Sequence, residues 1–296
     1  MRVTGMMQNT QMLKNLRNTN AGISDYQNKL ATGQKIHRPG DDPVGIGYLM
    51  RYNTELDRSD EFLENARTGT GWLNTMDALM QQATDVLHRA RVLTQQASTG
   101  TVPDDVRKQI ASEIKQLKEQ MVTIGNSTYS GRQIFNGQKT DIPPYTLAGA
   151  ATEGTDEGIY YLNVSSTVTV EVSITGEKIF GGAGDPDNVF KILDDIANHL
   201  DTDDQPALLN DLALIDVAAD RISSNAAEIG ARTNRFELVE NRILDEQIGL
   251  KELRSKTADV DMADAIVQLQ LKENILQASL ATGARIMQVS LIDFIR

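Results

Sequence analysis

The residue types that most often carry catalysis or bind metal ions are few in this chain and are not arranged for either task. Its three histidines, His37, His88 and His199, lie far apart, and none has a second ligand at helical spacing. Zinc sites draw on such closely spaced ligands. The chain has no cysteine, which removes thiolate catalysis, thiolate metal sites and disulfides together. We therefore expect no metal site.

Acidic pairs and one glycine-rich run match functional motifs only in part. The pairs Asp41-Asp42 and Asp104-Asp105 stand where helices should begin, where a carboxylate is favourable. The run 201–204 lacks the glycine and the distal glutamate of a calcium loop. The glycines at 181–184 are not followed by the Lys-Ser/Thr of a phosphate loop. The sequence predicts no catalytic residue and no cofactor, so we expect a protein that is not an enzyme.

Charge and composition narrow the class of partner. The formal net charge of the 296 residues is -12, which disfavours nucleic acid because no basic surface would displace phosphate counterions. No apolar run is long enough to span a bilayer, and the opening residues are too polar for a secretory signal. Only 5% of the residues are aromatic, which favours long packed helices over a thick globular core.

Apolar periodicity predicts long helices in the first half of the chain. A helix over 6–32 should end at Gly33, and after a turn Asp42 and Pro43 should begin the next one as N-cap and first residue. That helix would run to residue 97, roughly 80 Å at 1.5 Å per residue. Gly69 and Gly71 favour a bend or break within it. A third helix, up to residue 124, should fold back antiparallel on the second.

The middle of the chain changes character. A hairpin is predicted around 129–139, followed by strands at 158–164 and 167–174 with a turn at Ser165-Ser166. These polar, threonine-rich strands predict a small solvent-exposed β insertion. Helical periodicity returns at 188–200 and 208–250, where Glu240 and Gln247 interrupt the apolar seam. After a softer stretch at 255–259 comes a final helix.

The fold class follows from these elements. We predict a mainly α protein, with a long antiparallel helical coiled-coil bundle formed by the N- and C-terminal regions and a small inserted β domain. Its predicted segments are an N-terminal assembly and export segment (1–42), the two halves of a helical rod (43–139 and 187–255), the inserted β domain (140–186) and a C-terminal assembly helix (256–296).

Both terminal segments are amphipathic, yet each lacks an obvious intrachain partner other than the opposite end. Helices that bury their apolar faces only together or against other subunits are typical of an assembly device. The predicted assembly interface comprises Leu13, Leu16, Ile23, Leu30, Met262, Ile266, Leu269, Leu276, Leu280, Met287, Leu291, Phe294 and Ile295.

Three motifs carry a resemblance to a known family. The turn LATGQKIHRPGDDP at 30–43 contains Gly33, Pro39, Asp41, Asp42 and Pro43; ARTNR follows at 231–235, and MQVSLIDFI lies at 287–295. In this order the motifs resemble the flagellin superfamily, over about residues 1–139 and 187–296. The resemblance implies terminal helices that form a coiled coil inside a tube, surrounding helices, and an outer β domain.

The resemblance also implies a role outside the cell. The opening MRVT, the Arg38-Pro39 before the double aspartate, and GRQIFNG at 131–137 look like the members that join hook to filament. Implied partners are other copies of the chain, a neighbouring hook-associated protein, flagellin and an export chaperone, with export by the flagellar type III apparatus. Two alternatives remain open from the sequence: a filament flagellin and an intracellular coiled-coil scaffold.

Overall fold

The chain forms two compact units, which are described separately. The structure is a computed structural model that describes residues 5–99 and 102–294, with the backbone alone over 286–294. One unit, here called the terminal unit, comprises Met1–Asp57 and Gln247–Arg296. The other, the central unit, comprises Arg58–Glu246. These two units are defined by contacts within the chain, and their boundaries differ from those of the five predicted segments. The division into five segments therefore remains a prediction.

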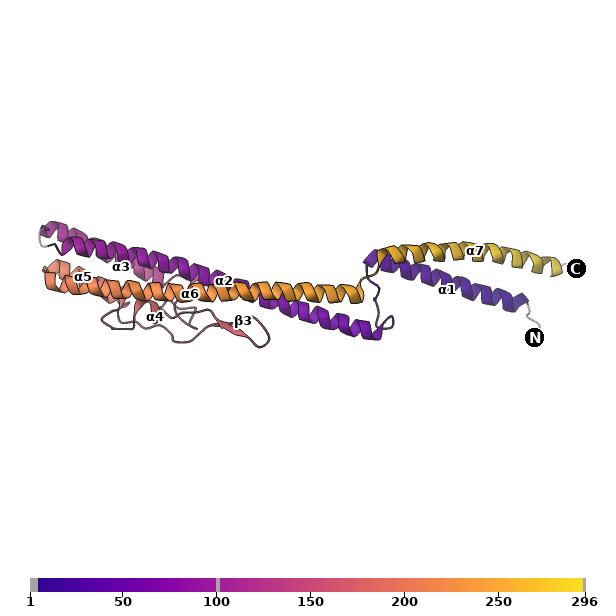
Figure 1. Cartoon of the computed structure of the whole chain (residues 1–296), viewed down its shortest axis with the longest axis horizontal. Helices are drawn as coiled ribbons and strands as arrows, with labels where there is room; N and C mark the ends of the chain where they lie inside the picture. Colours follow the sequence, from indigo (N-terminus) through magenta and orange to yellow (C-terminus); the bar gives the residue numbers. More distant parts are fainter. Residues whose placement is uncertain (1–4, 100–101, 295–296) are drawn as a thin grey trace. The chain divides into compact units, whose positions relative to one another are not determined.

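The terminal unit is built around two helices from opposite ends of the chain. Helix α1 (Gly5–Thr32) and helix α7 (Met262–Phe294) lie side by side (Figure 1). They run antiparallel, since Met12 lies against Gly283 near the open ends and Gly22 lies against Lys272 further along. The first turns of α2 and the last turns of α6 complete this unit.

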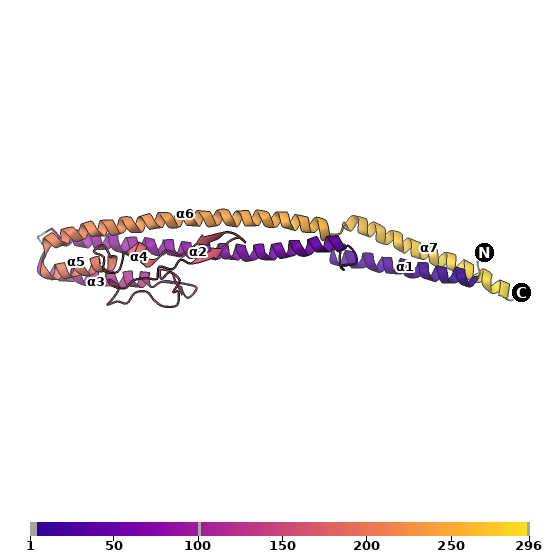
Figure 2. The same cartoon turned by 90° about the horizontal axis from the view of Figure 1, so that it is seen from below.

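The central unit is a helical bundle. Most of α2 (Pro43–Ala97) and α6 (Gln205–Ala258) belong to it, together with α3 (Asp104–Gly125) and α5 (Val189–Thr202) (Figure 2). The long pair is antiparallel: Arg67 bonds Glu240 at 2.9 Å, while Arg91, further along α2, bonds Asp216, which is earlier in α6, at 2.6 Å. Along this pair the buried core includes Met76, Met80, Leu87, Ile215 and Ile222.

The glycines of α2 do not break the helix, so the predicted break is wrong, while the alternative of a bend stays a prediction. Helix α2 is continuous through Gly69 and Gly71. A Cβ at Gly69 would lie 2.6 Å from the ring of the buried Phe236, and one at Gly71 would lie 2.4 Å from the Tyr129 hydroxyl. The glycines therefore serve close side-chain approach.

The inserted region buries apolar residues in the core of the central unit, which corrects the expectation of an exposed decoration. Strands β1 (Thr128–Tyr129) and β2 (Arg132–Gln133) form one antiparallel hairpin, and β3 (Tyr161–Asn163) and β4 (Thr169–Glu171) form a second, both shorter than predicted. A short helix, α4 (Gly176–Phe180), follows. The buried residues join the core of the central unit; they include Phe135, Tyr145, Val164, Val170, Val172, Ile174, Ile179 and Phe180.

Helix α6 extends further than the sequence indicated and buries two polar side chains. It continues to Ala258, through the stretch expected to be soft. Asp211 and Gln247 are buried on it. Asp211 Oδ2 lies 2.7 Å from His199 Nδ1, and the two atoms are hydrogen-bonded. Within the described residues, no helix has the length and apolarity that crossing a membrane requires.

Candidate assembly surface

The contact between α1 and α7 is a narrow seam. On α1 the half-buried side recurs every three or four residues, the spacing of a coiled coil. On α7 the matching side has the same spacing, and only Ala265 and Gly283 are fully buried on it. The α1 side of the seam is Met12, Leu16, Thr19, Ile23, Tyr26 and Leu30; the α7 side is Ala265, Leu269, Lys272, Leu276, Ser279 and Gly283.

The predicted interface residues divide between this seam and solvent. Leu16, Ile23, Leu30, Leu269 and Leu276 lie in the seam and are half-buried. Four others remain between 45% and 57% exposed, namely Leu13, Met262, Ile266 and Leu280. The side chains of Met287, Leu291, Phe294 and Ile295 lie outside the described residues. For all thirteen predicted interface residues, the role in assembly remains a prediction.

Sequence reasoning missed an apolar face of α7 that points away from the seam. Val267, Leu271 and Ile275 are 43% to 60% exposed, and with Ala278 they form what we call the outer stripe. Their spacing of four, four and three residues places them on one side of a helix. That spacing was readable from the sequence. Leu269 and Leu276 supply a first apolar face, and this face obscures the second one in the sequence pattern.

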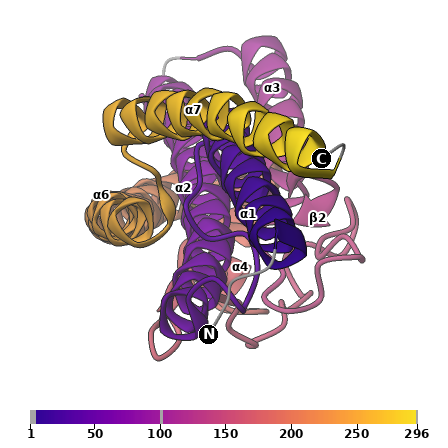
Figure 3. The ribbon, with the colours of Figure 1, turned by 90° about the vertical axis from the view of Figure 1, so that its right-hand side faces the viewer.

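A knob-in-hole contact sets the alignment of α1 with α7. Gly283 is buried, and the position that a Cβ would take there is occupied by the thioether of Met12. At Gly22 a Cβ would lie 3.4 Å from Lys272 Nζ. Small residues at these places let the two helices approach each other closely. Figure 3, seen from the side of the chain ends, shows α1 and α7 running together.

The family-motif turn is ordered by its aspartates. Gly33 ends α1 with φ +72°, a left-handed conformation that suits glycine. Asp41 accepts hydrogen bonds from the backbone N–H groups of His37 and Arg38, both at 3.0 Å, and these bonds lower the pKa of its carboxyl group. Asp42 accepts from Val44 and Gly45, as the predicted N-cap should. Pro43 is the first residue of α2, and Pro39 is exposed in the turn.

This turn is joined to the connection between α6 and α7. The Lys35 N–H donates to the Ala258 carbonyl at 2.7 Å, and the Val260 N–H donates to the Gly33 carbonyl at 2.9 Å. Lys35 Nζ adds a bond to the Lys256 carbonyl at 2.9 Å. The two connections that lead to the terminal helices therefore form one hydrogen-bonded structure.

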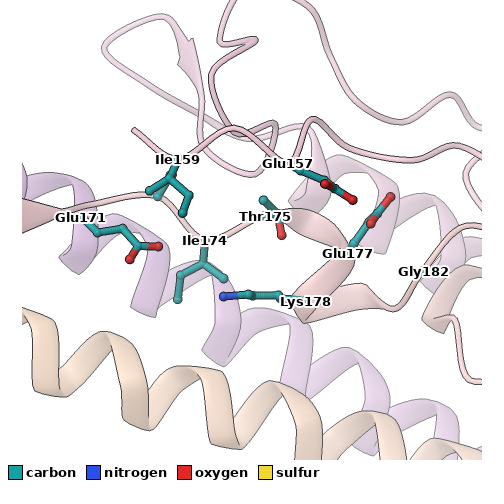
Figure 4. A pocket seen from close by; sticks show the side chains of 9 residues that line it. Glu157, Ile159, Glu171, Ile174, Thr175, Glu177, Lys178 and Gly182 are labelled. Carbon is teal, nitrogen blue, oxygen red and sulfur yellow. The ribbon is translucent and has the colours of Figure 1, made fainter. Parts of the chain in front are cut away.

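An acidic cavity lies in the inserted region. It measures about 410 Å³ and contains Glu157, Glu171, Glu177 and Lys178 (Figure 4). Glu171 is already paired with Arg232 at 3.2 Å. Across the part of the chain that the structure describes, no three histidine, cysteine or carboxylate side chains are grouped to hold a metal ion. We therefore take the apolar surface of α7, and not this cavity, as the candidate functional site.

Comparison with known families identifies the two ends of the chain. Residues 3–140 match the bacterial flagellin N-terminal helical region, and residues 212–295 match the bacterial flagellin C-terminal helical region. Flagellar hook-associated protein 3 of Escherichia coli K12 is 25% identical over 94% of this chain and 95% of its own length. The Treponema maltophilum flagellar filament 30.7 kDa core protein is 27% identical, over 95% of each chain.

Solved structures agree with this fold. The crystal structure of flagellar hook-associated protein 3 from Legionella pneumophila superposes with a TM-score of 0.60 at 18% identity, covering 70% of this chain and 99% of that one. The two family matches lie in the expected order, and together they include α1, α7 and most of the long helical pair. The chain therefore belongs to the flagellin superfamily.

Proposed function

We propose that this chain is a structural component of the bacterial flagellum that joins hook to filament. It would act as an adaptor, through coiled-coil packing of its terminal helices against neighbouring subunits. The observation that carries the proposal is the outer stripe of α7, because it is apolar along one helix side and the chain's own fold leaves it exposed. Two relatives named flagellar hook-associated protein 3 match nearly the whole chain, which supports the same role.

The energetics of the outer stripe favour assembly over a lone chain. Full burial of an aliphatic side chain contributes about 1.5–3 kcal/mol relative to leaving it in water. Val267, Leu271 and Ile275 would gain much of this free energy only when another helix covers them. Leu13, Met262, Ile266 and Leu280 would add to it from other sides of the same two helices. The terminal unit is thus matched to a partner that supplies further helices.

The partners proposed for this surface are other copies of the chain and, at its two boundaries, a hook-associated protein and flagellin. Contacts between different faces of identical subunits build an open helix when the rotation between successive subunits does not close into a ring. An adaptor between two tubes needs one such face toward each neighbour. We propose further that an export chaperone covers α7 before assembly and that the chain is exported through the flagellar type III apparatus.

The proposal is tested by removing α7. A chain that lacks residues 262–296 should keep the central unit folded and should fail to incorporate into flagella, since the outer stripe and half of the seam are gone. Circular dichroism checks the fold, and immunogold labelling of isolated flagella checks incorporation. A Gly230→Ala chain is the control, because no atom lies within 4 Å of the added methyl group. Normal incorporation of the truncated chain would overturn the proposal.

A filament subunit is the second candidate function, favoured by the 27% identity to a Treponema filament core protein. The two roles give different phenotypes in a strain that lacks this chain. Loss of an adaptor sheds unpolymerised flagellin into the medium, because filament subunits are exported but find no base. Loss of the filament subunit itself leaves no flagellin to shed. Intact filaments in that strain would contradict both roles.

A further inference from the structure

A second cavity lies in the central unit, where α2 meets the hairpin β1–β2 and the approach to β3. It measures about 350 Å³, within the range of small-molecule pockets. Thr68 and Trp72 reach it from α2, Tyr129 and Arg132 from the hairpin, and Tyr160 from the segment before β3. Nothing in the proposed assembly role uses these residues.

The walls of this cavity are aromatic in a chain that has few aromatic residues. Trp72 is the single tryptophan. Its ring centroid lies 5.7 Å from that of Tyr129, at an interplanar angle of 67°, and 5.8 Å from that of Tyr160. Gly71 allows this grouping, because a Cβ there would lie 2.4 Å from the Tyr129 hydroxyl. Tyr129 and Tyr160 are half-buried at the opening, and Trp72, which is 2% exposed, supports them from beneath, so the opening offers an apolar surface to a flat group.

Two hydrogen-bond donors among the residues that line the cavity, Trp72 and Arg132, have no carboxylate acceptor among the described residues. The indole N–H of Trp72 is buried and has no acceptor among the described residues. A buried, unpaired donor costs about 1–3 kcal/mol, so it is rare without a ligand or water to accept the bond. Arg132 donates to the Tyr160 hydroxyl at 3.3 Å, and no carboxylate of the described residues forms an ion pair with it.

We propose that this cavity binds a small aromatic carboxylate. The apolar ring would pack against Tyr129, Tyr160 and the small exposed part of Trp72, and the carboxylate would accept hydrogen bonds from the Arg132 guanidinium, which binds planar anions well. The ligand supplies acceptors where the protein supplies donors. This site lies wholly within the central unit and is independent of the terminal helices, so it goes beyond the proposed assembly role.

Phenylacetate is the probe, and the single tryptophan is the reporter. The full soluble chain is titrated with phenylacetate while the fluorescence of Trp72 is recorded, and isothermal calorimetry repeats the titration without relying on the indole. Benzyl alcohol, which keeps the ring, and acetate, which keeps the carboxylate, are titrated in parallel. We expect saturable binding of phenylacetate and at least about tenfold weaker binding of either fragment, since each loses one half of the recognition.

Arg132→Gln tests the charged contact, and Arg89→Gln is its matched control. Both arginines are exposed in the central unit, but Arg89 instead pairs with Glu113 on α3. Arg132→Gln should weaken phenylacetate binding about tenfold, the loss expected for one charge-assisted hydrogen bond, and should leave benzyl alcohol binding unchanged. Arg132→Lys should bind more tightly than Arg132→Gln because it restores the charge. Thermal unfolding confirms that each variant is folded.

Three results would overturn the inference. The first is a linear, non-saturable response to phenylacetate in both measurements. The second is equal binding of phenylacetate by the Arg132→Gln and Arg89→Gln chains. The third is equal affinity for phenylacetate and benzyl alcohol in the unaltered chain. Incorporation into flagella is measured separately and does not enter these outcomes, so the site and the assembly role fail independently.

Discussion

The terminal unit and the central unit use the same helical periodicity to different ends. In the central unit large side chains such as Phe236, Leu73 and Met80 are almost completely removed from solvent. Along α1 and α7 the fully buried residues with described side chains are Ala265 and Gly283, and the leucines of the seam are half-buried. One unit satisfies its apolar residues within the chain, whereas the other keeps a large part of them exposed.

This difference teaches where the apolar residues of an amphipathic helix can find partners. A helix with one apolar side needs one neighbour, and α3 has such a neighbour in the central unit. Helix α7 has the seam on one side, the outer stripe on another and Met262, Ile266 and Leu280 on a third. It needs several neighbours, and α1 is only one of them. The free chain and the assembled chain should therefore respond to mutation in different units.

The largest effect is expected from two alanine substitutions, one in each unit, that separate folding from assembly. Phe236→Ala should lower the free energy of unfolding of the central unit by about 3–5 kcal/mol, because it leaves a cavity in a closed core. Leu271→Ala should change the stability of the free chain by less than about 0.5 kcal/mol, because Leu271 is 51% exposed.

Leu271→Ala should instead reduce incorporation into flagella, where we propose that a neighbouring subunit covers that side chain. Chemical denaturation gives the first quantity, and quantitative immunoblotting of sheared flagella gives the second. The comparison between the units breaks if Leu271→Ala unfolds the free chain, or if it incorporates as well as the unaltered chain.

Two glycine-to-alanine substitutions should change stability by intermediate amounts and in opposite directions. Gly69→Ala should destabilise the central unit by about 1–2 kcal/mol, since the overpacking against Phe236 outweighs the better helix propensity of alanine. Gly230→Ala should stabilise α6 by up to about 1 kcal/mol, because its surroundings are open. Thermal unfolding of the two chains measures both. Equal shifts would show that propensity alone decides at both places.

The smallest effect concerns pH and the buried Asp211. Burial raises the pKa of this carboxyl group, the contact with His199 opposes the rise, and Asp195 and Asp204 add to it. A carboxyl group with a raised pKa in the folded state binds protons more readily folded than unfolded, so its contribution to stability falls as pH increases between the unfolded and folded pKa values.

Asp211→Asn should remove this contribution. Denaturation midpoints are measured between pH 3.8, the ordinary pKa of aspartate, and neutral pH. As the pH rises through this range, the midpoint should fall less steeply in the variant than in the unaltered chain. Parallel profiles would show that Asp211 does not titrate in this range. The terminal unit, which contains no such buried carboxyl group among its described residues, should be unaffected.

Much of the fold was predictable because it rests on local signals. Gly33, Asp42 and Pro43 marked helix ends through backbone conformation and capping, and the structure confirms all three. Strand pairing around Ser165-Ser166 was also predicted correctly, since a short polar turn between two β-rich runs leaves one arrangement.

What the sequence did not reveal depends on contacts between distant segments. Gly69 and Gly71 indicated a bend or break, but their partners, Phe236 and Tyr129, come from elsewhere in the chain. The inserted strands looked polar because threonine and serine alternate with valine, and only the fold shows that Val170 and Val172 face a core. On α7 the apolar pattern predicted candidate interface residues but did not indicate which of them α1 covers.

The pairing of Met12 with Gly283 has a consequence for the order of events during synthesis. Met12 and Gly283 are far apart in the sequence, so their contact is strongly non-local. Contacts of high sequence separation form late. While the ribosome is still translating, α1 has left it and the glycine that receives Met12 does not yet exist. Helix α1 therefore cannot form the seam until α7 has been synthesised. Until then, its seam face is free to bind another protein.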